Sequence, residues 1–218
     1  MIKANKKKWA DFIFNIYINR QFKSHFHSFN LIGDAPKIND NNSILLLSNH
    51  SSWWDGFFTY FINKQYFKKD FYIMMLEHKL KELTFFNKLG AFSINQNNPK
   101  EIINSLNYSA ELLFNKNNLV NIYPEGEMTY SFKNNYKSKN GILKVIDKVK
   151  DTNIILLAMK IVTLHEEYPQ VFFNLKLINK NELINIDLIF SNLLKEIDDN
   201  ILLNNYKIIL NGKKSKGN

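Results

Sequence analysis

The chain has 218 residues, 45% of them hydrophobic, and a formal net charge of +9. This length and composition are typical of one globular domain, not of two domains or a disordered chain. The absence of cysteine excludes a disulfide framework, thiolate catalysis and cysteine metal sites, and no apolar run is long enough to cross a bilayer or to form a signal peptide. The charge favours anionic partners, namely a nucleic acid, an anionic lipid surface or an acidic carrier protein.

The first 30 residues predict a basic amphipathic helix. Lysines at the start of the chain precede aromatic and aliphatic residues at helical spacing, namely Trp9, Phe12, Ile13, Ile16, Tyr17, Phe22 and Phe26. Such a helix either lies in a membrane interface, with its cations toward anionic headgroups, or docks on the core with a solvated lysine face. Both alternatives hold if they use different faces.

The apolar run Ile44 to Leu47 predicts a strand, which Ser48-Asn49-His50-Ser51-Ser52-Trp53-Trp54-Asp55 follows. Within one regular helix, side chains five residues apart point about 140° away from each other. His50 and Asp55 can therefore pair only if His50 lies in the turn that leaves the strand and Asp55 lies in the first turn of the next helix. We expect this helix at residues 52–63, with Ser51 or Ser52 as its N-cap.

A histidine paired with a carboxylate has a defined chemical use. The imidazole can remove a proton from a hydroxyl, and a buried carboxylate can fix its tautomer and orientation. The alternative is that His50 is a polar loop residue and that Asp55 is favoured by the helix dipole. Trp53 and Trp54 either contact lipid or pack in the core, and we expect at least one of them to be core.

Strands and helices alternate along the rest of the chain. We expect strands at residues 71–75, 90–94, 119–123, 154–162 and 171–178, and helices at residues 77–89, 98–114, 141–150 and 188–210. Asn98-Pro99 is a strong helix start, with Asn98 as cap. The alternation predicts an α/β fold, a single domain with a mixed, largely parallel sheet flanked by helices.

A second polar segment follows the strand at residues 119–123. It reads Tyr123-Pro124-Glu125-Gly126-Glu127-Met128-Thr129. A residue before proline favours extended geometry and Gly126 permits unusual dihedral angles, so the chain should leave the sheet sharply at its carboxyl edge. Open α/β sheets bind their ligands at this edge.

Four blocks in this order resemble those of the glycerolipid acyltransferase family, which includes the 1-acylglycerol-3-phosphate acyltransferases. The blocks are Asn49-His50-x-x-x-x-Asp55, Gly90-Ala91-Phe92-x-Ile94, Tyr123-Pro124-Glu125-Gly126 and the strand Ile154 to Ala158. The resemblance covers roughly residues 44 to 162. The resemblance implies transfer of a fatty acyl group from acyl carrier protein or coenzyme A to a hydroxyl of a membrane lipid. His50 would be the general base and Asp55 would orient it.

The resemblance also implies a set of substrate-binding residues and no metal or cofactor, with acyl-CoA or acyl-ACP as co-substrate. The substrate-binding set is Asn49, Ser51, Tyr123, Pro124, Glu125, Gly126, Glu127 and Thr129. Backbone N–H groups near the third block would face the oxyanion of the tetrahedral intermediate.

Two departures from the family pattern concern the acceptor. In members that act on lysophosphatidate the third block usually continues Thr-Arg-Ser and the second ends in Asp-Arg, whereas this chain has Glu127-Met128-Thr129 and Asn95-Gln96. Arginine binds phosphate in a bidentate way that neither replacement reproduces, and Glu127 would repel a phosphate dianion. We therefore expect a glycolipid, a carotenoid glycoside or an amino-acid-containing lysolipid as acceptor, with Glu125 and Glu127 accepting its hydroxyls.

The alternative acceptor is lysophosphatidate, with the phosphate site supplied by Gln96 and by Lys133, Lys137 or Lys139. Two rivals from other classes are a catalytically inactive lipid-binding protein and a basic nucleic-acid-binding domain. No nucleic-acid motif is present, so we expect no nucleic-acid partner.

The resemblance and the charge together predict a domain plan and a location. We expect a membrane-contact segment at residues 1–30, an acyltransferase domain at residues 31–210 and a flexible basic tail at residues 211–218. The protein should be peripheral on the cytoplasmic face of a membrane with an anionic surface.

Overall fold

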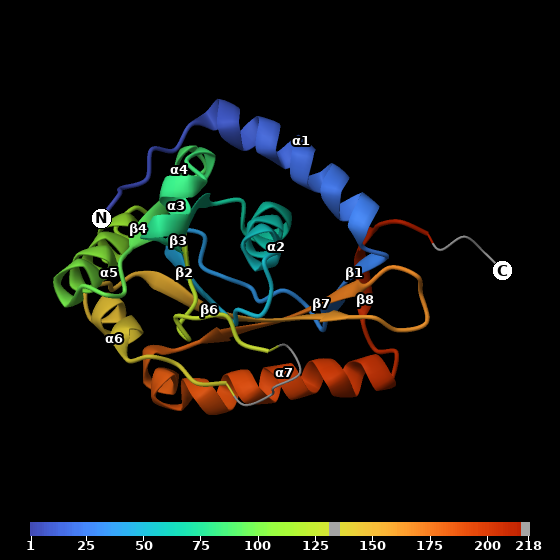
Figure 1. Ribbon diagram of the computed structural model, residues 1–218. Helices are drawn as coiled ribbons and strands as arrows, with labels where there is room; N and C mark the ends of the chain where they lie inside the picture. The colour runs from blue at the N-terminus through green and yellow to red at the C-terminus, as the bar shows by residue number, and fades with distance from the viewer. Residues whose placement is uncertain (131–135, 215–218) are drawn as a thin grey trace.

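The computed structural model describes residues 1–130 and 136–214. These residues form one eight-stranded sheet with the strand order β4-β3-β5-β2-β6-β7-β1-β8 (Figure 1). The strands are β1 Ser28–Ile32, β2 Ser43–Ser48, β3 Asp70–Leu76, β4 Ala91–Ile94, β5 Asn118–Ile122, β6 Thr152–Val162, β7 Gln170–Ile178 and β8 Lys207–Asn211. Among the described strands, the β6–β7 and β1–β8 pairs are antiparallel and the others are parallel. The predicted mixed, largely parallel α/β sheet is confirmed.

Helices cover both faces of the sheet (Figure 1). They are α1 Lys8–His25, α2 Asp55–Ile62 with the π-helical turn η1 Asn63–Phe67, α3 Glu77–Glu82, α4 Phe85–Lys88, α5 Pro99–Leu113, α6 Gly141–Ile146, and α7 Ile186–Leu202 after the 3₁₀ turn η2 Lys180–Asn185. In Figure 1, α1 and α2 lie above the sheet and α7 lies below it. The molecule is thus a three-layer α/β/α sandwich.

The central strands are buried on both faces, which explains their continuous apolar runs. In β2, Ile44 and Leu46 face a core cluster rich in phenylalanine beneath α1 and α2. Leu45 and Leu47 face a second cluster of mainly aliphatic residues against α5, α6 and α7. Strand β2, which carries the turn of interest, is therefore held from above and below.

The helix predicted at residues 188–210 is wrong in its second half. Helix α7 ends at Leu202, and residues 207–211 form the edge strand β8. Asn204 has a φ of 52°, a left-handed conformation that ends helices. Strand β8 pairs antiparallel with β1, which the sequence analysis had included in the N-terminal helical segment. Asn211 thus belongs to the sheet, and residues 215–218 of the predicted tail lie outside the described residues.

Two other predicted helices also need correction. The helix expected at residues 52–63 begins only at Asp55, with Trp54 and not Ser51 or Ser52 as its N-cap. The Ser52 hydroxyl accepts the Trp54 N–H at 3.1 Å, in the turn before the helix, and the N–H groups of both serines donate to the Asp55 carboxylate. The helix expected at residues 77–89 is two short helices, α3 and α4. Gly90 follows them with a φ of 107°, where a Cβ atom would lie 2.2 Å from the carbonyl oxygen of Phe71.

Other local predictions are confirmed. The Asn98 side chain caps α5 by accepting the N–H groups of Lys100 and Glu101, with Pro99 in the first turn. The strands expected at residues 71–75, 154–162 and 171–178 coincide with β3, β6 and β7 to within two residues.

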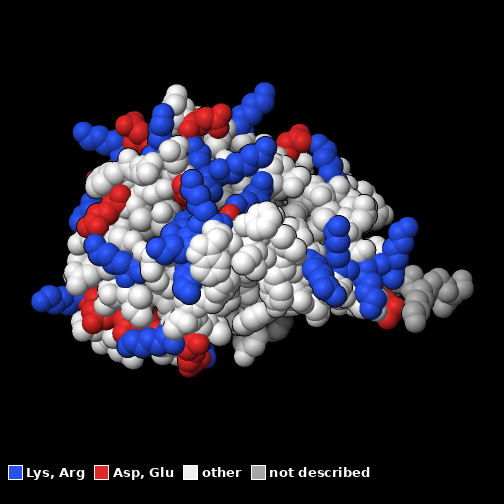
Figure 2. Space-filling model, turned by 90° about the horizontal axis from the view of Figure 1, so that it is seen from above, with Lys and Arg blue, Asp and Glu red and all other residues white. Residues whose placement is uncertain are grey.

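Helix α1 has two different apolar faces. Ala10, Phe14, Ile18 and Phe22 are buried against the phenylalanine-rich core, which confirms that the helix docks on the core. The other face exposes apolar side chains to solvent, namely Trp9, Phe12, Ile13, Ile16 and Tyr17. Figure 2 views the molecule from this side and shows Lys and Arg side chains around an uncharged surface. No helix among the described residues is long and apolar enough to span a membrane.

Candidate active site

The turn after β2 is anchored before it reaches His50. β2 lies between β5 and β6, parallel to both, so the ends of the three strands meet at one edge of the sheet. The Ser48 hydroxyl donates to Asn121 Oδ1 at 2.8 Å. The Asn49 amide donates to the Met159 carbonyl at 3.0 Å and accepts the Met159 N–H at 2.8 Å. Asn49, predicted to bind substrate, is buried and instead ties the turn to β6.

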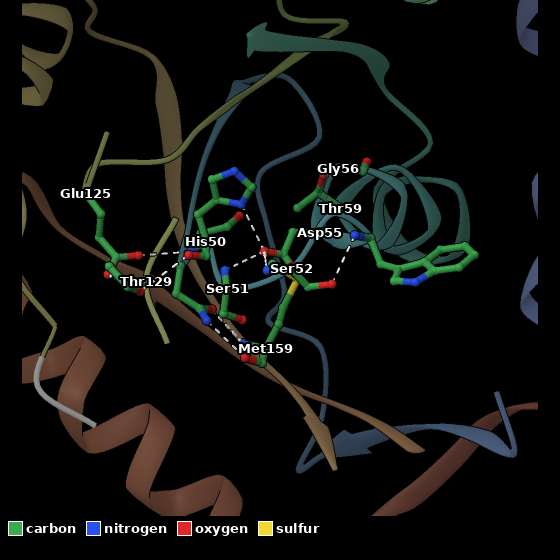
Figure 3. Close-up of polar contacts among 12 residues, drawn as sticks. His50, Ser51, Ser52, Asp55, Gly56, Thr59, Glu125, Thr129 and Met159 are labelled. Carbon is green, nitrogen blue, oxygen red and sulfur yellow. Dashed lines mark hydrogen bonds and ion pairs between the residues drawn. The ribbon is translucent and has the colours of Figure 1, made fainter. Parts of the chain in front are cut away.

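His50 and Asp55 pair, with His50 in the turn after β2 and Asp55 at the start of α2, the arrangement that their spacing requires. His50 Nδ1 lies 3.0 Å from Asp55 Oδ2, and the Asp55 side chain is 1% exposed (Figure 3). The same oxygen accepts the backbone N–H of Ser51 at 2.6 Å and of Ser52 at 2.8 Å. Because a carboxylate only accepts hydrogen bonds, Nδ1 carries the proton and Nε2 is the nitrogen that can accept one.

The imidazole is also held from the third block. The Tyr123 ring stacks on the His50 ring with centroids 4.3 Å apart and planes 18° apart. Burial raises the pKa of the Tyr123 phenol well above its usual range, with a smaller contribution from the Asp55 charge, so Tyr123 stays neutral. It therefore acts on His50 as an apolar wall.

Two residues predicted to bind substrate lie behind His50 instead. Glu125 Oε2 accepts the His50 N–H at 2.9 Å, and Glu125 Oε1 accepts the Thr129 hydroxyl at 2.9 Å (Figure 3). The Thr129 N–H donates to the His50 carbonyl at 2.7 Å. Burial raises the pKa of the Glu125 carboxyl, and the hydrogen bonds from His50 and Thr129 oppose that shift.

An apolar cavity of about 530 Å³ adjoins the His50 ring. Its apolar walls come from α1, α2, β3, α4, α5 and α6, and include Phe14, Phe57, Tyr60, Phe71, Ile73, Met74, Phe86, Leu89, Ile102, Leu106 and Ile142. Sequence patterns do not reveal this cavity, because its walls come from residues spread from position 14 to position 142. A long apolar pocket beside a base can hold an alkyl chain.

The predicted substrate-binding residues separate into two groups. Tyr123, Pro124, Gly126 and Glu127 line the cavity, whereas Asn49, Ser51, Glu125 and Thr129 do not. The two tryptophans of the first block separate in the same way. Trp53 lines the cavity and is 61% exposed, while the half-buried Trp54 packs its ring against Phe26 and Phe58. The prediction that at least one of the two belongs to the core is confirmed.

Several polar side chains on the cavity wall lie near Gly126. Gly126 has a φ of 72°, and a Cβ atom built on it would lie 2.9 Å from Lys139 Nζ, so the lysine side chain lies across the glycine. Gln96 donates to the Gly126 carbonyl, and Glu127 and Lys139 line the same cavity. Lys137 is exposed and is not part of the lining, and Lys133 lies outside the described residues.

Comparisons with known proteins identify a family and a fold. A family model described as Acyltransferase matches residues 31–163, more than half of the chain. The crystal structure of the 1-acyl-sn-glycerophosphate (LPA) acyltransferase PlsC from Thermotoga maritima aligns with a TM-score of 0.52 at 13% identity, covering 90% of this chain and 82% of that chain. At this identity the alignment shows a shared fold. A search of curated proteins finds no significant match.

Proposed function

The chain belongs to the acyltransferase family, and on that premise we propose that it transfers a fatty acyl group from an acyl thioester to a hydroxyl of a membrane lipid. The family match confirms the resemblance drawn from the four sequence blocks. The observation that carries the proposal is the His50–Asp55 pair at 3.0 Å on the wall of an apolar cavity. A base oriented by a buried carboxylate beside an apolar pocket suits this reaction.

The proposed mechanism is direct attack. The acceptor hydroxyl gives its proton to His50 Nε2 while its oxygen attacks the thioester carbonyl, and Asp55 stabilises the resulting imidazolium. The tetrahedral oxyanion collapses to the new ester, and the departing thiolate takes the proton from Nε2. General-base assistance of this kind typically supplies about 10²- to 10⁴-fold in rate.

The cavity supplies the proposed site for the acyl chain. Its side chains come from both core clusters of the protein, with Phe14, Phe57 and Phe71 on one side of the sheet and Leu106 and Ile142 on the other. Each methylene buried there contributes about 0.8 kcal/mol. The donor, acyl-ACP or acyl-CoA, would present its thioester at the His50 end of the cavity.

For the acceptor, we propose a lipid without a phosphate monoester, such as a glycolipid, a carotenoid glycoside or an amino-acid-containing lysolipid. Met128 and Gln96 stand where lysophosphatidate-specific members carry arginine, and both line the cavity. Glu127 is exposed on the same wall and can accept a hydroxyl. Glu125, the other carboxylate expected to do so, is not part of the wall.

A second candidate acceptor, lysophosphatidate, is favoured by one observation. Lys139 lies across Gly126 on the cavity wall and could bind a phosphate as a point charge. Glu127 and Lys139 therefore lie on the same cavity wall but favour different acceptor headgroups, a hydroxyl-bearing one and a phosphate respectively.

Turnover of purified protein tests both candidates. Acyl-ACP and acyl-CoA of one chain length should be offered with lysophosphatidate or with a neutral glycosylated lysolipid, to wild type and to Lys139→Met. We expect faster turnover of the neutral acceptor and little effect of Lys139→Met on it. Preference for lysophosphatidate that Lys139→Met abolishes would establish the second candidate instead. Failure of every acceptor would favour an inactive lipid-binding protein.

We also propose that the exposed face of α1 places the enzyme on the cytoplasmic surface of a membrane. Its support is the row of exposed aromatic and aliphatic side chains with lysines around them (Figure 2). Phe12→Ser with Ile16→Ser should lower binding to anionic vesicles at least tenfold, since each side chain loses its burial in lipid. The matched control is Ile184→Ser with Leu188→Ser, two exposed residues at the opposite helical layer. Equal binding by all proteins would contradict the proposal.

A further inference from the structure

The third sequence block does two different things in the structure. Tyr123, Gly126 and Glu127 face the cavity, where substrate would lie. Glu125 and Thr129, from the same seven-residue segment, face away from the cavity and bond to the main chain of His50. The block is therefore not one substrate-binding surface.

We propose that Glu125 and Thr129 are positioning residues, which hold the His50 peptide units so that the imidazole meets Asp55 on one side and the acceptor hydroxyl on the other. This inference rests on the proposed role of His50 as general base. It assigns to Glu125 and Thr129 a role that does not require contact with substrate.

The bonds account for both main-chain groups of His50. Glu125 Oε2 accepts the His50 N–H at 2.9 Å, while the His50 carbonyl accepts the Thr129 N–H at 2.7 Å and its hydroxyl at 3.3 Å. The Thr129 hydroxyl also lies 2.9 Å from Glu125 Oε1. The His50 backbone is thus enclosed in a closed ring of hydrogen bonds with these two residues.

The burial of Glu125 points to the same role. Glu125 is 5% exposed, and a buried carboxylate is costly unless hydrogen bonds compensate it. Both of its oxygens are engaged by the catalytic turn and its partner Thr129. On the N-terminal side of His50, the Asn49 side chain bonds to Met159. On its C-terminal side, Asp55 accepts the N–H groups of residues 51 and 52. The main chain is therefore held by hydrogen bonds before, at and after His50.

Thr129→Val and Thr129→Ser test the role by steady-state kinetics. Valine has the shape of threonine without its hydroxyl, and serine keeps the hydroxyl. For Thr129→Val we expect kcat to fall about tenfold, the effect of one lost buried hydrogen bond, with the KM for the acceptor unchanged. Thr129→Ser should restore most of kcat. A raised KM at unchanged kcat would overturn the proposal and indicate substrate binding.

A second measurement does not depend on turnover. The His50 Nδ1 proton, held by Asp55, should give a downfield proton NMR signal, which is assigned by its loss in His50→Ala. We expect the signal in wild type and Thr129→Ser, and its displacement or loss in Thr129→Val. If the signal moves but wild type acylates no acceptor, the proposed function fails while the positioning role stands. If wild type is active and neither kcat nor the signal changes in Thr129→Val, the positioning role alone fails.

Discussion

The turn that carries His50 and the cavity beside it are stabilised by different interactions. In the turn, Asp55 and Glu125 are almost fully buried, and their carboxylates accept main-chain N–H groups at 2.6 to 2.9 Å. In the cavity wall, most side chains are apolar and are held only by packing. His50 is where the two regions meet.

This difference shows how chemistry and selectivity can be separated within one site. Hydrogen bonds are directional, so the turn fixes the base in one orientation. Apolar packing has no direction, so the cavity would select the chain that we propose it binds by length and shape. Changes in the turn should therefore alter kcat, and changes in the wall should alter which chain is accepted.

The largest effect is expected from removing the base. His50→Ala should lower kcat by about 10³-fold, since it removes the proposed general base that Asp55 orients on the cavity wall. The measurement is initial rate with a saturating donor. His78→Ala is the matched control, because His78 is exposed on α3 and does not line the cavity. Unchanged turnover in His50→Ala would remove His50 from the mechanism.

The next largest effect is expected from neutralising Asp55. Asp55→Asn should lower kcat by about 10²-fold, because an amide stabilises the imidazolium far less than a carboxylate does. It should also destabilise the fold by about 1–3 kcal/mol, since the N–H groups of Ser51 and Ser52 lose a charged acceptor. Chemical unfolding measures the second effect. A variant with normal stability and normal kcat would contradict the orienting role.

A change in the cavity wall should act on chain length rather than on the chemistry. Ile73→Trp removes room for about two methylenes, so long-chain donors should lose about tenfold in kcat/KM while short-chain donors keep theirs. A competition assay with donors of graded length measures this. Ile103→Trp is the control, because Ile103 is exposed on α5 outside the cavity. An equal loss of kcat/KM for donors of every chain length would indicate that the substitution disturbs the turn that carries His50 and not the binding of the chain.

The smallest effect is a pH dependence of stability. Burial raises the pKa of the Glu125 carboxyl above its ordinary 4.5, so the carboxyl group binds its proton more tightly in the folded state than in the unfolded state. The contribution of Glu125 to stability should therefore decrease as the pH rises from about 4.5 through the folded-state pKa. Unfolding free energies of wild type and Glu125→Gln, measured from pH 4 to 7, should converge at the acidic end. If the unfolding free energies of the two proteins changed with pH in parallel, the raised pKa of Glu125 would be contradicted.

The sequence predicted the local geometry of the base better than its surroundings. The five-residue offset of His50 and Asp55 required a turn followed by a helix start, and the structure has both. The helix start itself was wrong, because the Asp55 carboxylate accepts the N–H groups of Ser51 and Ser52 and holds these residues in a turn, so the helix begins only at Asp55. Competing polar side chains at a turn are hard to rank from sequence.

Long-range features were missed for a physical reason. Strands β1 and β8 pair with each other from opposite ends of the chain, and β8 is short and partly exposed, so neither carried a clear periodicity. The different tasks of Glu125 and Glu127 depend on which way each side chain points on its own side of the Gly126 bend. Glu125 and Glu127 are two residues apart in a turn without regular secondary structure. Their spacing in the sequence therefore does not determine how the two carboxylates are oriented relative to each other.

The reliance of Asp55 on main-chain donors has an evolutionary consequence. Positions 51 and 52 contribute their N–H groups to the carboxylate, and this contribution does not require their hydroxyls. Every amino acid except proline has such a group. A library randomised at these two codons and selected for acyl transfer should therefore lack proline at both positions and return varied side chains at position 51. Position 52 should favour side chains that can accept the Trp54 N–H as the Ser52 hydroxyl does, so position 51 is the place where the sequence can drift while the reaction is preserved.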